Sequence, residues 1–155
     1  MKTTEKKVLL ELLENSRKKI TEIAEAVGIS RQTVSKKIEK LDEEGIIDFF
    51  TVSLDEKKLG LNVRAYVILN LDPSSELRQE FVQEAKDFEK ISQIHYTFGR
   101  FDMVMEVLVE DEEELDGIIS RIHDFEAVEE TETLICRYTE KRELKAPVRE
   151  FLTGN

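Results

Sequence analysis

The segment Thr21–Leu41, TEIAEAVGISRQTVSKKIEKL, constrains the fold of this chain more than any other stretch. Apolar residues recur about one helical turn apart on both sides of Gly28, a residue that favours a turn. They are Ile23 and Val27 before the glycine, and Val34, Ile38 and Leu41 after it. Two helices joined by a short turn containing glycine are typical of a helix-turn-helix, whose second helix enters the DNA major groove. Ordinary helical hairpins share this pattern, so further features of the chain are needed to distinguish the two.

Residues 1–45 are predicted to form a three-helix domain around this segment. We expect Thr4, Thr21 and Ser30 to be the three N-caps, because hydroxyl side chains accept hydrogen bonds from exposed backbone N–H groups. Gly45 is the expected end of the last helix. The apolar residues of the three helices are expected to share one small core: Val8, Leu9, Leu12, Leu13, Ile20, Ile23, Ala24, Val27, Ile29, Val34, Ile38 and Leu41.

Charge is distributed unevenly along the chain. The net charge is −11, which argues against a protein that coats nucleic acid without regard to sequence. Residues 1–45 carry a net charge of +1, and residues 46–155 carry −12. Within residues 30–40 there are four basic residues and one acidic residue, Glu39. This pattern favours a small DNA-binding domain attached to an acidic body.

Residues 46–60 are predicted to form a connector strand followed by a turn. The sequence IIDFFTVSL is rich in branched and aromatic residues, which favour strands. Its apolar residues occupy both faces of such a strand, so we expect the strand to pair with another chain. The chain then turns at Gly60.

Residues 61–139 are predicted to form a ferredoxin-like βαββαβ domain, so the fold class is α+β. One helix is expected after Asp72 as N-cap and Pro73, and another after Asp111 as N-cap with Glu114 in a capping box. Residues 140–155 form a charged tail that is either a short helix or irregular. The expected strands are Val63–Leu71, Ile91–Phe98, Met103–Val109 and Val128–Tyr138.

Both helices of such a domain cover one face of the sheet and leave the other face open. We expect the open face to be rich in apolar groups, and exposed apolar patches of that size mark interaction surfaces. The sequence therefore predicts a homodimer, which suits a protein that binds paired DNA half-sites.

Composition disfavours several other classes of protein. No apolar run approaches the roughly 20 residues of a membrane-spanning helix, so we expect a cytoplasmic protein without a membrane partner. The single cysteine, Cys136, excludes an intramolecular disulfide and a cysteine-based zinc site. Neither His95 nor His123 has a carboxylate or cysteine partner at a metal-ligand spacing. We therefore expect no metal, no cofactor and no catalytic residue.

Two segments resemble the leucine-responsive/asparagine-regulator (Lrp/AsnC) family of feast-or-famine transcription factors. They are ITEIAEAVGISRQTVSKKIEKLDEEGII and HYTFGRFDMVMEV, and VEETETLI with Thr131 and Thr133 resembles the last strand of that family. The resemblance covers about residues 4–138. It departs from the family at residues 125–128, FEAV, where a glycine usually precedes the valine.

The resemblance implies a dimer that assembles further, up to octamers, and binds an amino acid near a Gly-x-x-Asp hairpin between dimers. Arg100 would pair with a ligand carboxylate, and Asp102 would either accept a hydrogen bond from an ammonium group or fix the turn. Without the resemblance, the hairpin is an ordinary turn with glycine at a positive φ. The residues assigned to the effector are Thr97, Gly99, Arg100, Phe101 and Asp102.

The basic helix is expected to contact DNA with the face opposite its apolar stripe. Gln32 and Lys36 complement adenine and guanine edges respectively, and Ser35 lies beside them. Glu39 repels phosphate, so contact should be confined to the first two turns. The alternative is a helix face that only contacts solvent.

The remaining cationic side chains of this helix are expected to hold phosphates, together with the free N–H groups at its start. Thr33 lies near the N-terminal end of this helix, where the helix would enter the major groove. The complete set assigned to DNA is Ser30, Arg31, Gln32, Thr33, Ser35, Lys36, Lys37 and Lys40.

The leading interpretation is a DNA-binding transcriptional regulator, not an enzyme, whose assembly and DNA affinity respond to a small molecule, with an amino acid as the expected effector. Two alternatives stay open from the sequence. Siroheme decarboxylases, which are enzymes, resemble the same two-domain architecture, although the four cations of the basic helix favour DNA. A module that assembles subunits or senses metabolites without DNA is the other alternative.

Overall fold

The computed structural model describes residues 1–154, except for the side chain of Ser75, and the chain divides into two compact units. The first unit comprises Met1–Ser53 together with the segment that begins at Lys141. The second unit is Leu54–Glu140. Each unit has its own hydrophobic core. Among the described residues, no helix is both long enough and apolar enough to cross a membrane.

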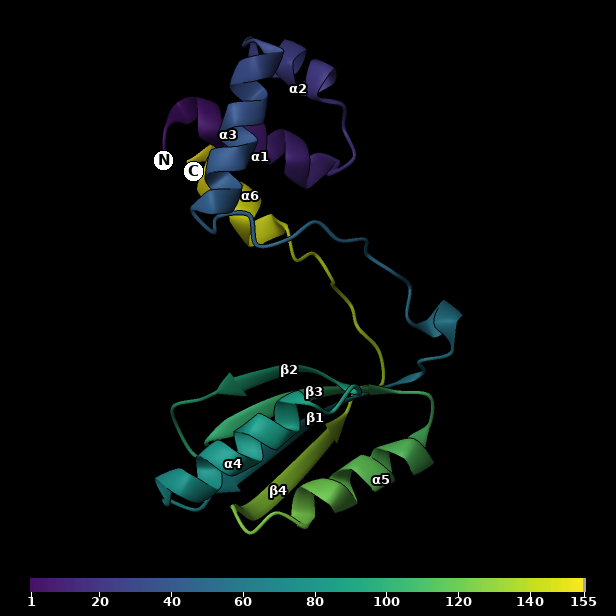
Figure 1. Cartoon of the computed structure of the whole chain (residues 1–155). Helices are drawn as coiled ribbons and strands as arrows, with labels where there is room; N and C mark the ends of the chain where they lie inside the picture. Colours follow the sequence, from purple (N-terminus) through teal and green to yellow (C-terminus); the bar gives the residue numbers. More distant parts are fainter. Residues whose placement is uncertain (155) are drawn as a thin grey trace. The chain divides into compact units, whose positions relative to one another are not determined.

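The first unit contains the predicted helix-turn-helix (Figure 1). Gly28 adopts the left-handed conformation, with a φ of 75°, and ends the helix before the turn. Ser30 is the N-cap of the next helix, and its hydroxyl accepts the Thr33 N–H at 3.2 Å. The N-terminal helices are α1 (Thr3–Glu14), α2 (Ile20–Val27) and α3 (Arg31–Glu43).

The predicted N-caps Thr4 and Thr21 are wrong, because α1 and α2 each begin two residues earlier. A glutamate in the first turn supplies the missing hydrogen bond in both helices. Glu5 accepts the backbone N–H of Lys2 at 2.7 Å, and Glu22 accepts the equivalent N–H at the start of α2 at 3.0 Å. A carboxylate that reaches back in this way satisfies an exposed N–H group, so the hydroxyl is not needed.

The core of the first unit is small. Ile20, which was predicted to be part of it, is exposed in the first turn of α2, and Leu9 and Leu13 are only half-buried. The buried cluster is Val8, Ile23, Ala24 and Val34, with Leu12, Val27, Ile29 and Ile38 packed around it.

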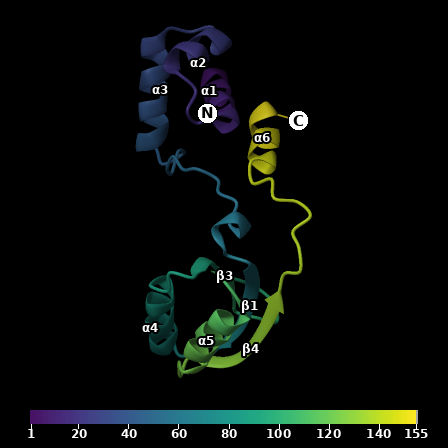
Figure 2. The same ribbon diagram turned by 90° about the vertical axis from the view of Figure 1, so that its right-hand side faces the viewer.

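The C-terminal segment completes this unit with α6 (Ala146–Thr153), which packs against α1 (Figure 2). Leu152 is only 5% exposed. The Arg149 guanidinium lies 3.1 Å from the Glu14 carboxylate. The tail is therefore a helix, which is one of the two possibilities that the sequence left open.

The second unit is a four-stranded antiparallel sheet in the order β2-β3-β1-β4, with both helices on one face (Figures 1 and 2). This arrangement confirms the ferredoxin-like prediction. A short 3₁₀ helix, η1 (Lys57–Leu59), precedes the sheet. The elements are β1 (Val63–Leu71), α4 (Ser75–Lys86), β2 (Ile91–Tyr96), β3 (Met103–Val109), α5 (Glu112–His123) and β4 (Val128–Ile135).

Several boundaries differ from the prediction. β1 and β3 have the expected bounds, whereas β2 and β4 end two and three residues early. Asp72 is not the N-cap of α4, because its carboxylate instead accepts the Ser74 N–H at 2.7 Å and stabilises the turn before the helix. Asp111 is the N-cap of α5, as predicted, and accepts the Glu114 N–H at 2.9 Å.

The predicted connector strand within residues 46–60 is not formed in the single chain. None of the four described strands pairs with this segment, so its backbone N–H and C=O groups have no ladder partner. Phe49, Phe50 and Val52 are exposed. A strand whose predicted partner is another chain has no reason to form in one copy.

The core of the second unit lies between the sheet and the two helices. Alternate residues of β1 and β3, from Ala65 to Leu71 and from Met103 to Val109, are fully buried. They pack against Phe81 of α4 and Leu115 of α5, among others.

The opposite face of the sheet is mixed rather than uniformly apolar. Arg64 forms an ion pair with Glu106 at its centre, and the Ser92 hydroxyl donates to Glu106 at 3.0 Å. The register places apolar side chains around this pair on the same face: Tyr66, Ile68, Val104, Leu108 and Leu134.

Candidate functional site

The residues predicted to contact DNA occupy the N-cap and the first ten residues of α3. The apolar side of the helix is fixed by Val34 and Leu41, which are fully buried. Ser35 and Lys37 are half-buried at the edge of this side, and the other six side chains are exposed: Ser30, Arg31, Gln32, Thr33, Lys36 and Lys40.

Gln32 and Lys36 lie one turn apart on the exposed face of α3. Lys36 forms no ion pair with any described residue, so its ammonium group is available to an anion or to a base edge. Arg31 is likewise exposed and forms no ion pair within the described part of the chain. The first two turns of α3 thus present two unpaired cations and an amide.

Lys37 and Lys40 are in a different situation, because both face the carboxylate of Glu5 on α1. Their ammonium groups lie 3.7 Å and 3.1 Å from Glu5 Oε1, and Lys40 also lies 3.4 Å from Glu44. The backbone N–H of Lys2 and then the Lys40 ammonium lower the pKa of Glu5 to about 2. Glu5 and then Glu44 raise the pKa of Lys40. Both lysines, predicted as phosphate contacts, are therefore paired within the unit.

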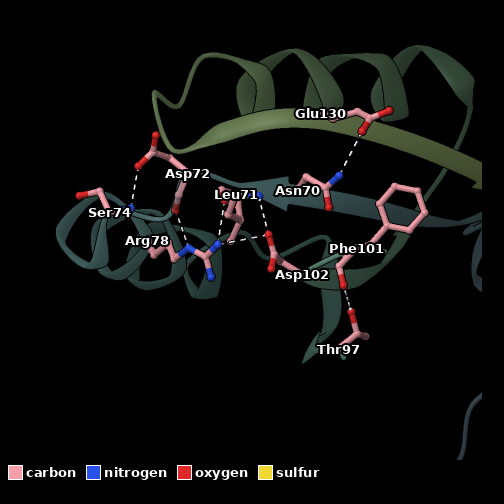
Figure 3. Close-up of polar contacts among 9 residues, drawn as sticks. All are labelled: Asn70, Leu71, Asp72, Ser74, Arg78, Thr97, Phe101, Asp102 and Glu130. Atoms are coloured by element: carbon pink, nitrogen blue, oxygen red, sulfur yellow. Dashed lines mark hydrogen bonds and ion pairs between the residues drawn. The ribbon is translucent and has the colours of Figure 1, made fainter. Parts of the chain in front are cut away.

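The predicted effector residues lie in the hairpin between β2 and β3, and Figure 3 shows three of them, Thr97, Phe101 and Asp102. Thr97 closes this hairpin, because its N–H donates to the Asp102 carbonyl at 2.9 Å and its hydroxyl donates to the Phe101 carbonyl. Gly99 has a φ of 142°, a backbone conformation that favours glycine. The glycine and threonine therefore shape the turn.

The carboxylate of Asp102 points back into the chain and not out of the hairpin (Figure 3). Its Oδ2 accepts the Leu71 N–H at 2.9 Å and lies 3.2 Å from the Arg78 guanidinium. Arg78 also donates to the carbonyls of Leu71 and Asp72. These contacts tie the hairpin to the loop between β1 and α4, which corresponds to the turn-fixing role considered for Asp102.

Arg100 of the same hairpin is exposed, whereas Phe101 beside it is half-buried. The Arg100 guanidinium lies 4.9 Å from the centre of the Phe101 ring and 3.9 Å from the Glu130 carboxylate, and its side chain is mostly exposed. A cation at this position is accessible to a ligand carboxylate. An open depression of about 610 Å³ lies along α4 and Tyr96, and none of the five hairpin residues lines it.

Sequence reasoning did not identify Glu5 or Arg78 as site residues. Glu5 had a detectable signal, since a glutamate in the first turn of a helix is a capping-box position. Arg78 had none, because its partner Asp102 is 24 positions away. Among the described residues, no group of three His, Cys, Asp or Glu side chains is placed to hold a metal ion.

Comparisons with known proteins identify the family of each of the two units. A family model described as winged helix-turn-helix DNA-binding matches residues 1–48, and one described as Lrp/AsnC ligand binding domain matches residues 64–145. An uncharacterized HTH-type transcriptional regulator of Pyrococcus furiosus is 34% identical, over 91% of this chain and 95% of its own. The transcriptional regulator AzlB of Bacillus subtilis is 29% identical, over 96% of each chain.

Solved structures share the fold. The structure of a transcriptional regulator–L-Met complex from Neisseria meningitidis superposes with a TM-score of 0.90 at 16% identity, over 97% of this chain and 99% of that chain. The family matches follow the order of the two units, and the second covers more than half of the chain. The chain therefore belongs to the Lrp/AsnC family of transcriptional regulators.

Proposed function

We propose that this protein binds operator DNA through the first two turns of α3 and that an amino acid bound at the 97–102 hairpin controls its DNA affinity. The exposed pair Gln32 and Lys36 carries the DNA part of the proposal. These side chains follow the helix-turn-helix turn at Gly28, and Lys36 is a cation without an ion-pair partner among the described residues of an otherwise acidic chain.

The roles on α3 follow from side-chain chemistry. Gln32 and Lys36 contact base edges, with Ser35 beside them, because an amide complements adenine and an ammonium group complements guanine. Arg31 holds a phosphate at the helix N-terminus, where backbone N–H groups also attract anions. Ser30 and Thr33, whose hydroxyl oxygens lie 2.8 Å apart, hold the entry of the helix in place.

The effector part of the proposal rests on Arg100 and Phe101. An exposed guanidinium beside an aromatic ring offers a bidentate partner for a carboxylate and an apolar surface for a side chain. The Neisseria meningitidis relative is described as an L-Met complex, which supports an amino acid as ligand here. The guanidinium of Arg100 is exposed, so a second subunit that docks on this hairpin could complete the site.

Homo-oligomers follow from the same surfaces. The open sheet face and the exposed connector residues Phe49, Phe50 and Val52 bring two copies together, and the hairpin joins dimers into larger assemblies up to octamers. Two-fold symmetry then presents two α3 helices to paired half-sites. A ligand between dimers alters which helices reach adjacent half-sites.

No catalytic step is part of the proposed function. Both histidines face neutral side chains: His95 Nε2 lies 2.9 Å from the Gln93 amide oxygen, and His123 faces the Thr131 hydroxyl. Among the described residues, neither has the carboxylate partner that orients a catalytic imidazole. The proposed partner is DNA, and in the organisms that contain its relatives the DNA lies in the cytoplasm. We therefore propose that the protein acts in the cytoplasm.

Selection of bound fragments from a genomic DNA pool, followed by binding curves on the selected sites, tests the proposal. Lys36→Gln and Gln32→Ala are each expected to reduce discrimination between selected and random DNA, with about 1–3 kcal/mol per lost base contact. Lys86→Gln, an exposed lysine on α4, is the matched control and should leave binding unchanged.

The same binding curves are repeated with each of twenty amino acids, alongside sedimentation velocity. At least one amino acid should change both the DNA affinity and the sedimentation profile, and Arg100→Gln should abolish its effect. Intact site preference in both α3 variants would disprove the DNA assignment. Indifference to all twenty amino acids at saturating concentration would disprove the effector assignment.

A further inference from the structure

Glu5 is a buried carboxylate beneath the helix that we assign to DNA. Its residue is only 4% exposed, and Glu5 and Glu106 are the two buried acidic residues of the described chain. Oε2 accepts the Lys2 N–H at 2.7 Å, whereas Oε1 faces Lys40 and Lys37. A buried charge is costly unless it is paired, so these contacts account for its place in the fold.

The four cations of α3 therefore fall into two groups. Arg31 and Lys36, in the first two turns, form no ion pair within the described chain. Lys37 and Lys40, which lie about one turn apart on the side of α3 that faces α1, share the carboxylate of Glu5, and Lys40 also pairs with Glu44; their side chains are 16% and 48% exposed. Either lysine can reach a phosphate only by leaving a buried carboxylate with one partner fewer, which is unfavourable.

We propose that Glu5 is a positioning residue for DNA recognition, which withholds Lys37 and Lys40 from the DNA backbone and so limits contact to the face of α3 that carries Arg31, Gln32 and Lys36. The proposal rests on the assignment of α3 to DNA. It identifies a residue on another helix, distant in sequence, as a determinant of specificity.

The physical consequence concerns the balance between two kinds of contact. Lysine–phosphate pairs bind any DNA sequence, and each contributes about 0.9 to the slope of log K against log salt. Base contacts carry the sequence preference. Glu5 holds both lysines and cancels one of their two positive charges, which lowers the affinity for random DNA while the base contacts of Gln32 and Lys36 are unaffected. Glu5 thereby raises the ratio of specific to non-specific binding.

Glu5→Gln tests the proposal, because the amide oxygen can still accept the Lys2 N–H while the charge is lost. Binding to a selected site and to random DNA is measured as a function of salt concentration. The salt slope should steepen by about one to two per DNA-bound α3, and binding to random DNA should strengthen more than binding to the selected site. Glu43→Gln, an exposed carboxylate near the end of the same helix, is the matched control and should change neither the slope nor the ratio by as much.

The lysines provide a second measurement that does not depend on the folding of Glu5→Gln. In the wild-type background, Lys37→Gln and Lys40→Gln should leave the salt slope almost unchanged, whereas Lys36→Gln should reduce it. In the Glu5→Gln background, the same two changes should reverse the steepening. A wild-type slope that falls as much in Lys37→Gln as in Lys36→Gln would overturn the proposal.

The failure of this proposal and the failure of the DNA assignment give different results. If Glu5→Gln binds DNA with the wild-type slope and the wild-type site preference, Glu5 has no role in recognition although α3 still binds DNA. If Lys36→Gln and Gln32→Ala have no effect, α3 is not the contact surface and the proposal fails with it. NMR titration of the Glu5 carboxyl in DNA-free protein then shows separately whether the ion pairs exist.

Discussion

The two units of this chain achieve their folds with very different amounts of buried apolar surface. The second unit buries fifteen residues in one cluster, whereas the cluster of the first unit contains four. The first unit adds the contacts of α6 with α1 and the ion pairs of Glu5. Since smaller cores give less stability, we expect the first unit to unfold at lower temperature than the second. The DNA-binding part of the molecule thus depends more on polar and terminal contacts.

The largest expected effect is that of removing an aromatic ring from the larger core. Phe81 is fully buried and packs edge-on against Phe125, with ring centroids 5.1 Å apart. Phe81→Ala should destabilise the second unit by about 3–5 kcal/mol, because it removes buried surface and leaves a cavity. Calorimetry of the whole chain should show the upper transition shifted and the lower one unchanged.

Phe98 provides the matched control, because it is a fully exposed phenylalanine in the same unit. Phe98→Ala should change stability by less than about 0.5 kcal/mol. If Phe81→Ala shifted both transitions together, the two units would unfold as one and the contrast between their cores would be wrong.

The next effect concerns the contribution of α6 to the first unit. Leu152→Ala should destabilise this unit by about 2–3 kcal/mol, because Leu152 is a buried side chain of the helix that packs on α1. The lower calorimetric transition should shift and the upper one should not. Leu144→Ala, at an exposed leucine before the helix, should have almost no effect. If Leu152→Ala and Leu144→Ala shifted the lower transition by the same amount, α6 would not stabilise the DNA-binding unit.

The smallest expected effect is the pH dependence that Glu5 gives to the first unit. The pKa of Glu5 is lowered from 4.5 to about 2, so its contribution to folding is fully present above about pH 5, where the carboxyl is ionised in both the folded and the unfolded state. It is lost as the pH falls through the folded-state pKa, between about pH 5 and pH 2. Part of the effect is screened by solvent around Lys40.

The difference in the free energy of unfolding between wild type and Glu5→Gln isolates the contribution of the Glu5 charge. It is measured by chemical denaturation at several pH values. The difference should shrink steadily from pH 5 to pH 2. A difference that stayed constant over that range would show that the Glu5 carboxylate is not preferentially stabilised in the folded state.

Much of this architecture was predictable because its causes are local in the sequence. The glycine turn at Gly28, the N-caps Ser30 and Asp111, and the bounds of β1 and β3 all follow from periodicity and turn chemistry within a few residues. The order βαββαβ follows from the same short-range patterns. The starts of α1 and α2 were misplaced because a first-turn glutamate replaced a hydroxyl as the hydrogen-bond acceptor.

The candidate site divides in the same way. The exposed face of α3 with Gln32 and Lys36 was visible from helical periodicity alone. The ion pairing of Lys37 and Lys40 could not be predicted in this way, because their partner Glu5 lies about 35 positions away, on a different helix. The connector strand was predicted from composition, but strand formation requires a hydrogen-bonding neighbour that one chain does not supply.

The sequence alone therefore determined which segments are helices and strands, and which helix faces outward with basic side chains. Only the tertiary structure decided which charges remain unpaired. It brought Glu5 beneath α3, Arg78 against Asp102, and α6 onto α1. Local propensity depends on neighbours within one or two turns, whereas ion pairs and helix packing depend on which distant segments meet when the core closes.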